Sequence, residues 1–299
     1  MRRFGRQNGC RGVALLIVLW ILVLLSIVSG TLALLANAEV MEARTLFDGS
    51  RARAAALGGL HRAVFELRNP DRETRWVPDG RNYEYELGEA TVQLSIIDET
   101  GKLDLNSADE QTLRRLFETQ GLDPQAAAQV TDAVLDWRDP DELVRPNGAE
   151  LAEYENAGLE YGPRNGALAT VEELQQVLGI SYSLYQAVEP AVTVFSGRSQ
   201  INAAFAPPEA LATLPRMEEA DVRDFVEQRE QQSGQARQPL SLPDGTSVLP
   251  QRGGLTYSIT SRATLDNGAW SQVKATVRLG TDSLGQPFRI VRWRQGVTE

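Results

Sequence analysis

The chain has 299 residues, with 30 Lys and Arg against 40 Asp and Glu, one cysteine (Cys10) and one histidine (His61). This length is enough for one large domain or two smaller ones, while a single cysteine and a single histidine leave no pair for a disulfide or a Cys/His zinc site. Four of the basic residues precede Val13, so 26 basic residues stand against 40 acidic ones beyond that point, a net charge of −14. Such a surface disfavours nucleic-acid binding, which depends on cationic contacts to phosphate.

The first predicted element is an apolar helix near the N-terminus. The 24 residues from Val13 to Ala36 carry no charge. As a helix they span about 36 Å, which exceeds the roughly 30 Å hydrocarbon core of a bilayer. Arginines precede this run, at positions 2, 3, 6 and 11. They favour a cytoplasmic N-terminus, so we expect a single-pass protein whose remaining chain lies on the far side of the membrane.

Three interpretations of this segment are open. Ala36-Asn37-Ala38 is a small-x-small site at which a secretory signal would be cut, although the apolar run exceeds the usual 7–15 residues of a signal core. The helix can also remain as an uncleaved anchor. The Arg11-Gly12 junction favours a third interpretation, because it resembles the signal of type IV pilins and type II secretion pseudopilins, which prepilin peptidase cuts after the glycine. That resemblance implies a leader of residues 1–12, a cut between Gly12 and Val13, and methylation of the Val13 amine.

The fifth residue after this junction is Ile17. Most proteins with this signal have a glutamate there, whose carboxylate pairs with the terminal amine of a neighbouring subunit in the filament core. A buried amine without its anionic partner is costly. We therefore expect a subunit with Ile17 to be poorly suited to stacking beneath a filament tip, and the missing glutamate is a feature of the K-type minor pseudopilins.

Helical spacing continues beyond the membrane through residues 37–69, where Asn69-Pro70 ends it. The stripe expected to pack on the rest of the protein contains small and apolar residues three or four apart: Ala43, Leu46, Ser50, Ala54, Leu57, His61, Val64 and Leu67.

Two separate regions predict β-strands. Residues 70–100 contain alternating segments at 83–87 and 90–98, joined by Gly88-Glu89 as a hairpin. Residues 255–299 contain three more strands, at 255–265, 269–279 and 287–294. We expect the two regions to pair in one sheet on the stem helix, with everything between them inserted.

The inserted part is predicted to be helical, which makes the fold class α+β. It comprises a main helical domain over 101–200, a second helical hairpin over 201–230, and a polar linker or loop over 231–254. Helical patterns occur at about 107–119, 124–137, 149–157, 170–178, 181–188, 207–214 and 218–230.

The insert also contains an internal similarity. Segments 105–139 and 201–230 share a leading asparagine, a turn, and a second helix that ends near an arginine. This layout resembles the helix-hairpin-helix repeats of DNA-binding competence proteins. The turns "FETQGLDPQ" and "LPRMEEAD" are acidic and lack a GxG, however, so we expect no nucleic-acid partner. A membrane-anchored DNA-binding protein of this type is the alternative function.

Four segments, in this order, carry a resemblance that covers nearly the whole chain. They are "RGVALLIVLWILVLLS" without Glu at Ile17, "IIDETGKLDLN" at 96–106, "LDWRDPDE" at 135–142 with "NGAE" at 147–150, and "INAAFAPPEALATL" at 201–214. Together they resemble the general secretion pathway protein K family, the minor pseudopilins of the type II secretion system. The resemblance implies a pseudopilin sheet with a large inserted all-α domain of the helix-hairpin-helix or SAM-like type.

The resemblance also implies a location and a function. The protein would sit in the inner membrane with its C-terminal domain in the periplasm, and then at the tip of the pseudopilus. Its partners would be the I- and J-type minor pseudopilins and the major pseudopilin. It would initiate pseudopilus assembly and support export of folded proteins across the outer membrane, as a structural subunit and not an enzyme.

A cluster of four carboxylates lies in the insert, at Asp136, Asp139, Asp141 and Glu150. Calcium takes six to eight oxygen ligands, and a loop of this kind supplies several. The loop is not an EF-hand, because Val144 stands where that motif requires glycine. The family resemblance implies Ca²⁺ binding at these four residues.

Two alternatives for the acidic cluster are open. Leu151 and Ala152 stand where the family has further acidic residues, which favours a solvated acidic loop with Arg138 and Arg145 as its partners. An anchored hydrolase that uses a carboxylate pair is the second alternative, although the sequence offers no nucleophile–base pair for it.

Overall fold

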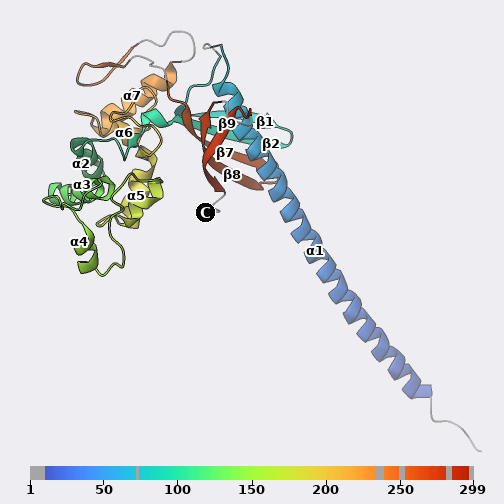
Figure 1. Cartoon of the computed structure of the whole chain (residues 1–299). Helices are drawn as coiled ribbons and strands as arrows, with labels where there is room; N and C mark the ends of the chain where they lie inside the picture. Colours follow the sequence, from blue (N-terminus) through green and yellow to red (C-terminus); the bar gives the residue numbers. More distant parts are fainter. Residues whose placement is uncertain (1–10, 72–73, 233–238, 249–252, 281–284, 296–299) are drawn as a thin grey trace, which may run out of the picture.

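A 57-residue helix carries a head that contains an antiparallel sheet and a helical insert. The computed structural model describes residues 11–71, 74–232, 239–248, 253–280 and 285–295. The helix α1, Arg11–Leu67, projects far beyond the head (Figure 1) and is about 86 Å long at 1.5 Å per residue. Among the described residues it alone is long and apolar enough to cross a membrane. The predicted leader, residues 1–12, lies outside the described residues except for the backbone of its last two positions.

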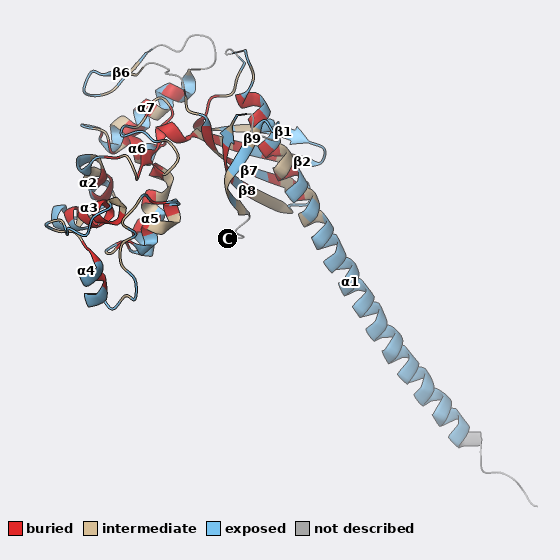
Figure 2. Ribbon diagram, in the orientation of Figure 1, coloured by how far each residue is buried: buried red, intermediate tan, exposed pale blue. Residues whose placement is uncertain are grey.

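Only the C-terminal part of α1 packs against the head, and Figure 2 shows the rest of the helix exposed. The stripe predicted from the spacing is wrong in phase: Ala54 and His61 are exposed, and only Val64 and Leu67 of that stripe are buried. The buried face consists of small and apolar residues, namely Ala52, Ala55, Ala56, Gly59, Leu60, Ala63, Val64 and Leu67. The sheet thus packs against the face of the helix whose small side chains let the helix backbone approach the sheet most closely.

A five-stranded antiparallel sheet supports this end of α1. Its order is β1-β2-β7-β8-β9, with β1 Asp79–Leu87, β2 Ala90–Asp98, β7 Thr256–Leu265, β8 Trp270–Leu279 and β9 Phe288–Gln295. The two β regions meet where β2 pairs with β7, with Ile96 opposite Ile259. The prediction that they form one sheet on the stem helix is therefore confirmed. Alternate residues of β2 and β7 are buried against α1, as the two-residue period of a strand requires.

The helical insert leaves the sheet after β2 and returns before β7, and it has a hydrophobic core separate from that of the sheet and stem. Its helices are α2 Glu110–Thr119, α3 Pro124–Arg138, α4 Leu151–Asn156, α5 Tyr182–Val188, α6 Pro208–Leu211 and α7 Glu219–Gln231, with 3₁₀ turns η1 Glu99–Gly101, η2 Val171–Gln176 and η3 Glu189–Ala191. The predicted helical segments are present, although the segment at 170–178 forms a 3₁₀ turn.

Two short strand pairs in the insert were not predicted. Strands β3 Leu103–Asp104 and β4 Val192–Thr193 pair in parallel at the base of the insert. Strands β5 Leu240–Ser241 and β6 Ser247–Val248 form a small hairpin inside the stretch that was expected to be a loop. Pairs of only two residues carry no periodic signal, which is why the sequence does not reveal them.

A buried arginine fixes the insert to the sheet. Arg229 of α7 donates to the carbonyl oxygens of Ala203 and Ala206 in the insert, and also to the carbonyl of Asp79 in β1. Its Nε lies 3.6 Å from Asp79 Oδ2, and Arg81 donates to the same carboxylate. Burial lowers the pKa of Arg229, and the negative charge of Asp79 opposes that effect. The pair therefore holds α7 against β1.

A second contact lies at the opposite edge of the sheet. Arg292 and Arg294 of β9 both donate to Glu172 and Glu189 of the insert, with Arg292 Nη2 at 2.5 Å from Glu172 Oε1. Burial raises the pKa of Glu172, but the hydrogen bonds from the two arginines outweigh it and bring the pKa to about 2. The insert is thus attached at both edge strands.

Candidate metal centre

The loop between α3 and α4 brings the predicted acidic residues together. Asp136 lies in the last turn of α3, Asp139 is its C-cap, and Glu150 is the N-cap of α4. Asp141 lies in the intervening turn and is exposed, and its Oδ1 accepts a hydrogen bond from Leu143 N. Three of the four carboxylates therefore face a common region, while the fourth lies at its outer edge.

Asp136 is the centre of this arrangement. It is fully buried, and its Oδ2 accepts hydrogen bonds from the backbone of Arg145 (3.2 Å) and Ala149 (2.9 Å). The loop passes so close to it that a Cβ on Gly148 would lie 1.9 Å from Asp136 Oδ2. Any side chain at position 148 would therefore clash with Asp136, so the position requires glycine.

Two residues that hold this loop, Asp132 and Asn147, were not predicted as site residues. Asp132, one helical turn before Asp136 on the same face of α3, accepts hydrogen bonds through Oδ2 from the backbone and the side chain of Asn147, at 3.1 and 3.0 Å. The four-residue spacing of Asp132 and Asp136, together with the Asn147-Gly148 turn, is the signal that would have indicated them.

The carboxylates raise one another's pKa values. Burial raises the pKa of Asp136, and burial followed by the charge of Asp141 raises that of Asp139. Burial, then the charges of Asp136 and Asp139, raise the pKa of Glu150 to about 7. Burial and then the neighbouring carboxylates thus disfavour the charged forms of these side chains.

One of the two arginines expected to neutralise the loop does so. Arg145 places Nε 3.2 Å from Asp136 Oδ1 and Nη2 3.8 Å from Asp139 Oδ2. Arg138 instead donates to the backbone carbonyls of Leu105 and Ala108, and so braces α3 against the start of α2. Among the described residues Arg138 therefore forms no ion pair with the acidic loop, and it acts there only through its charge, which opposes the rise that burial causes in the pKa of Asp139.

Three carboxylate oxygens in the cluster are buried without a hydrogen-bond partner: Asp136 Oδ1, Asp139 Oδ1 and Glu150 Oε1. Carboxylate oxygens of this kind are ligands for hard cations such as Ca²⁺. Within the described part of the chain, however, no three Asp, Glu, His or Cys side chains already surround one ion position. The Arg145 side chain, which is 39% exposed, lies against two of the carboxylates. The carboxylate oxygens are of the right chemical type for a hard cation, but one could bind them only by displacing this guanidinium.

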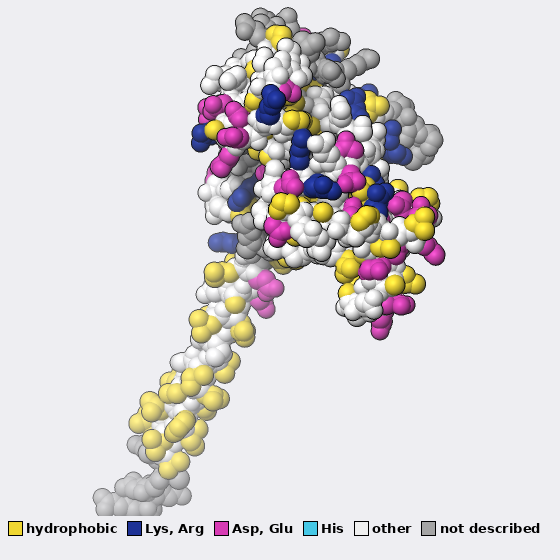
Figure 3. All heavy atoms as spheres, turned by 90° about the vertical axis from the view of Figure 1, so that its left-hand side faces the viewer, with side chains coloured by type: hydrophobic (Ala, Val, Ile, Leu, Met, Phe, Trp, Pro, Cys, Tyr) yellow, Lys and Arg dark blue, Asp and Glu magenta, His cyan; other side chains and the backbone are white. Residues whose placement is uncertain are grey.

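Apolar side chains adjoin the acidic loop on its solvent side. Leu143, Val144 and Leu151 are exposed. In Figure 3 the lowest lobe of the head, formed around α4, shows mainly acidic and hydrophobic side chains. The same view shows the hydrophobic surface of the stem below the head.

Comparison with known proteins identifies the family. A family model described as "Type II secretion system (T2SS), protein K" matches residues 93–197, which include all four carboxylates. The type II secretion system protein K of Klebsiella pneumoniae is 28% identical over 242 residues, covering 74% of this chain and 73% of that protein. The protein K of Pectobacterium carotovorum subsp. carotovorum is 26% identical over 303 residues, covering 92% and 90%. The chain belongs to the type II secretion system protein K family.

The fold of this protein K family member also matches a solved structure. The crystal structure of the GspK-GspI-GspJ complex from enterotoxigenic Escherichia coli contains a chain that aligns with a TM-score of 0.55 at 20% identity, covering 88% of this chain and 99% of that one. The match supports the arrangement of a long helix, an antiparallel sheet and a helical insert.

Val13 and Ile17, the positions that bear on processing and filament packing, lie in the exposed part of α1.

Proposed function

We propose that this protein is the minor pseudopilin at the tip of the type II secretion pseudopilus, where it initiates assembly and supports export of folded proteins across the outer membrane. The observation that carries the proposal is the insert between β2 and β7, which has its own core and is attached to both edge strands. A head widened in this way leaves no room for identical subunits to stack above it along a filament. Its role is structural, not enzymatic.

The proposed partners are the I- and J-type minor pseudopilins, with the major pseudopilin below them. The solved structure that shares this fold is a complex of GspK with GspI and GspJ, one chain of which aligns with this protein. Co-purification tests the proposal: the full chain, expressed with the I- and J-type subunits of the same organism, should elute with both. Elution of the chain alone, with the other two associated with each other, would exclude this assembly.

The stem is proposed to be cut and retained. Prepilin peptidase would cleave between Gly12 and Val13, and the N-terminus would lie in the cytoplasm before assembly while the head lies in the periplasm. Mass spectrometry of the mature N-terminus, after co-expression with a prepilin peptidase, should find methylated Val13. An N-terminus at Glu39 would indicate an ordinary signal peptide, and a retained Met1 would indicate an uncleaved anchor.

The position of Ile17 supports placement at the tip. Without a carboxylate at this position the stem cannot neutralise the terminal amine of a neighbour in the apolar filament core. Restoring the acid with Ile17→Glu should alter tip assembly and the contacts between neighbouring stems, which disulfide crosslinking between cysteines introduced into the stems would detect. If Ile17→Glu leaves tip assembly and stem contacts unchanged, the electrostatic explanation is wrong.

The helix-hairpin-helix character of the insert does not favour DNA binding. Helix pairs α2–α3 and α6–α7 are each joined through a left-handed residue, Gly121 (φ 88°) and Arg216 (φ 60°). The backbone N–H groups that would meet phosphate are already used, because Asp123 accepts from the first turn of α3 and Glu218 forms a capping box at α7. These acids also repel phosphate, so a structural helical hairpin pair fits the geometry better.

We further propose that the acidic loop binds Ca²⁺ through Asp136, Asp139 and Glu150, with Asp141 at the rim. The support is the three buried carboxylate oxygens without a hydrogen-bond partner, of which Asp136 Oδ1 is ion-paired with Arg145 Nε; a bound ion would supply positive charge to all three. Isothermal titration of the full chain in neutral detergent should give a calcium heat that Asp136→Asn abolishes. The matched control is Glu155→Gln on α4, an exposed acid that has no contact with the cluster. Absence of heat, with no change in melting temperature, would remove the proposal.

A further inference from the structure

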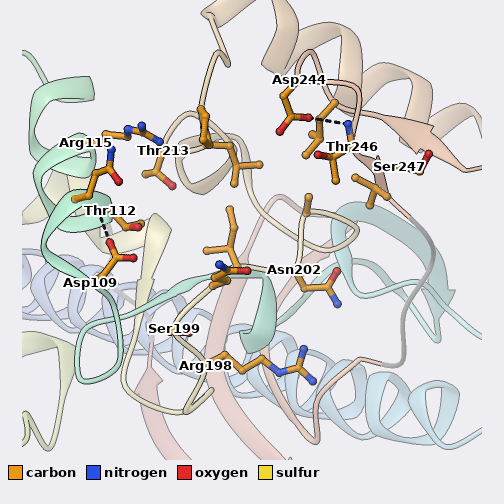
Figure 4. Close-up of a pocket in the computed structure, with 18 of the residues that line it drawn as sticks. Asp109, Thr112, Arg115, Arg198, Ser199, Asn202, Thr213, Asp244, Thr246 and Ser247 are labelled. Atoms are coloured by element: carbon orange, nitrogen blue, oxygen red, sulfur yellow. Dashed lines mark hydrogen bonds between the residues drawn. The ribbon is translucent and has the colours of Figure 1, made fainter.

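A second concave site lies in the insert, apart from the acidic loop. It is a groove of about 800 Å³ between the start of α2, the loop 197–203 after β4, the segment 213–215 that follows α6, and the β5–β6 hairpin. Figure 4 shows these four segments converging on it. Polar side chains form most of its walls, and the apolar lining includes Ile201, Leu214, Leu242 and Val248.

The groove carries two arginines that form no ion pair with any described residue. Arg198 is exposed, and its side chain has no hydrogen-bond partner within the described ranges. Arg115 of α2 is half-buried and lies near Asp109 without a direct ion pair. The two acids of the groove, Asp109 and Asp244, each accept a backbone N–H, from Thr112 and Thr246 respectively. Arg198 is therefore the charged side chain of the groove that is left for the anionic group of a ligand.

Asn202 adds an unsatisfied donor to the wall of this groove. It is only 8% exposed, and its Nδ2 has no hydrogen-bond partner, while its Oδ1 accepts from Ala204 N. A buried amide without a partner is unfavourable, so a ligand oxygen that reaches it is stabilised.

The first helical hairpin has an asparagine at the equivalent position, and its side chain hydrogen-bonds to the backbone of another segment. Asn106 and Asn202 are the leading asparagines of the two similar segments. Asn106 accepts from Leu168 N (2.8 Å) and donates to Leu168 O (2.9 Å), so it binds both backbone groups of a residue that lies outside any helix or strand. No described segment occupies a similar position at Asn202, where the groove is open.

The hairpin that borders the groove also offers a strand edge. β6 contributes Ser247 and Val248 to the lining and pairs only with β5 in the described sheet. An unpaired strand edge accepts an extended peptide by main-chain hydrogen bonds.

We propose that this groove binds an extended segment of a partner protein that carries a carboxylate side chain. The segment's backbone pairs with β6 and with Asn202, and its carboxylate is held by Arg198, assisted by Arg115. The site uses none of the residues of the acidic loop or of the stem, and it does not depend on placement at a filament tip.

The test is a fluorescence anisotropy titration of the full chain in neutral detergent. The probe is a peptide of alternating Glu and Val with Ser at both ends, capped and labelled with an uncharged dye, and the control peptide has Gln in place of Glu. We expect saturable binding of the acidic peptide and at least tenfold weaker binding of the Gln peptide, because hydrogen bonds to a charged group contribute more than neutral ones.

Matched variants locate the site. Arg198→Glu should weaken binding about tenfold or more, and Arg115→Gln should weaken it less, whereas Arg223→Glu should not change it. Arg223 is an exposed arginine of α7 that does not line the groove. A benzophenone on the peptide should crosslink to 197–203 or 246–248. No saturable binding, equal loss in Arg198→Glu and Arg223→Glu, or crosslinks elsewhere would each overturn the proposal.

Discussion

The packing of the stem helix on the sheet gives a prediction whose size follows from the structure. A Cβ placed on Gly59 would lie 2.2 Å from Ser261 Oγ on β7 and 2.9 Å from Val92 Cγ1 on β2. Both distances are shorter than van der Waals contact, and Ser261 and Val92 are both fully buried. Gly59→Ala therefore forces α1 away from the sheet or moves both side chains.

The expected cost is an overpacking term of about 1–3 kcal/mol. It is reduced by the roughly 1 kcal/mol that alanine gains over glycine in a helix. Gly49→Ala is the matched control, because it lies in the same helix and a Cβ there meets no heavy atom within 4 Å. The difference between the two variants isolates the overpacking term.

The assay is hydrogen exchange of the full chain in neutral detergent, read by mass spectrometry for the amides of β7. Amides of α3, in the separate core of the insert, serve as the internal reference. Gly59→Ala should lower the opening free energy of β7 by up to about 2 kcal/mol and leave α3 unchanged, while Gly49→Ala should raise it slightly.

A second substitution tests whether the contact with Ser261 causes the lost protection of β7. Ser261 Oγ is buried and has no hydrogen-bond partner, so Ser261→Ala alone should cost little. In the double variant with Gly59→Ala it removes the 2.2 Å contact and should recover about half of the lost protection. Equal protection of β7 in the Gly59→Ala and Gly49→Ala variants, or no recovery with Ser261→Ala, would refute the close-approach argument.

Three further outcomes are expected. Arg145→Ala should strengthen Ca²⁺ binding measured by titration calorimetry, because it removes the cation that contacts two of the proposed ligands; weaker binding would mean that Arg145 orders the site. The pKa of Glu172 is lowered to about 2, so its ion pairs stabilise the folded state above about pH 4.5, and that stabilisation is lost as the pH falls towards 2. The measurement is hydrogen exchange of the β9 amides as the pH is lowered. Glu172→Gln should remove the loss of protection that comes from Glu172, and a pH dependence identical to that of the unsubstituted protein would contradict this prediction. Asp79→Ala leaves Arg229 buried without its anion and should destabilise the protein by about 3–5 kcal/mol in thermal unfolding, far more than Glu172→Gln; equal effects would mean that Arg229 does not need its counter-charge.

The local elements of this protein were accessible from the sequence because their signals are local. Alternation at 90–98 predicts β2 with the bounds that the structure has, and the apolar run beginning at Val13 predicts the membrane-capable helix. The four carboxylates were found as a cluster because they lie within fifteen residues of one another. Even the pairing of two distant β regions follows, since a strand with one apolar face needs a partner and only the C-terminal region offers strands to match.

Tertiary structure alone decided the features that depend on distant contacts. The stem offers several adjacent faces of small residues, and only the sheet selects the one that contains Gly59. Arg138 and Arg145 are equally close to the acidic loop in sequence, yet only Arg145 reaches it, because Arg138 finds carbonyl oxygens at the start of α2. The same holds for Arg292 and Arg294, whose partners in the insert are more than 100 residues away. Spacing along the chain determines which face or turn a residue occupies, whereas charge pairing and close packing are determined by what lies opposite it in space.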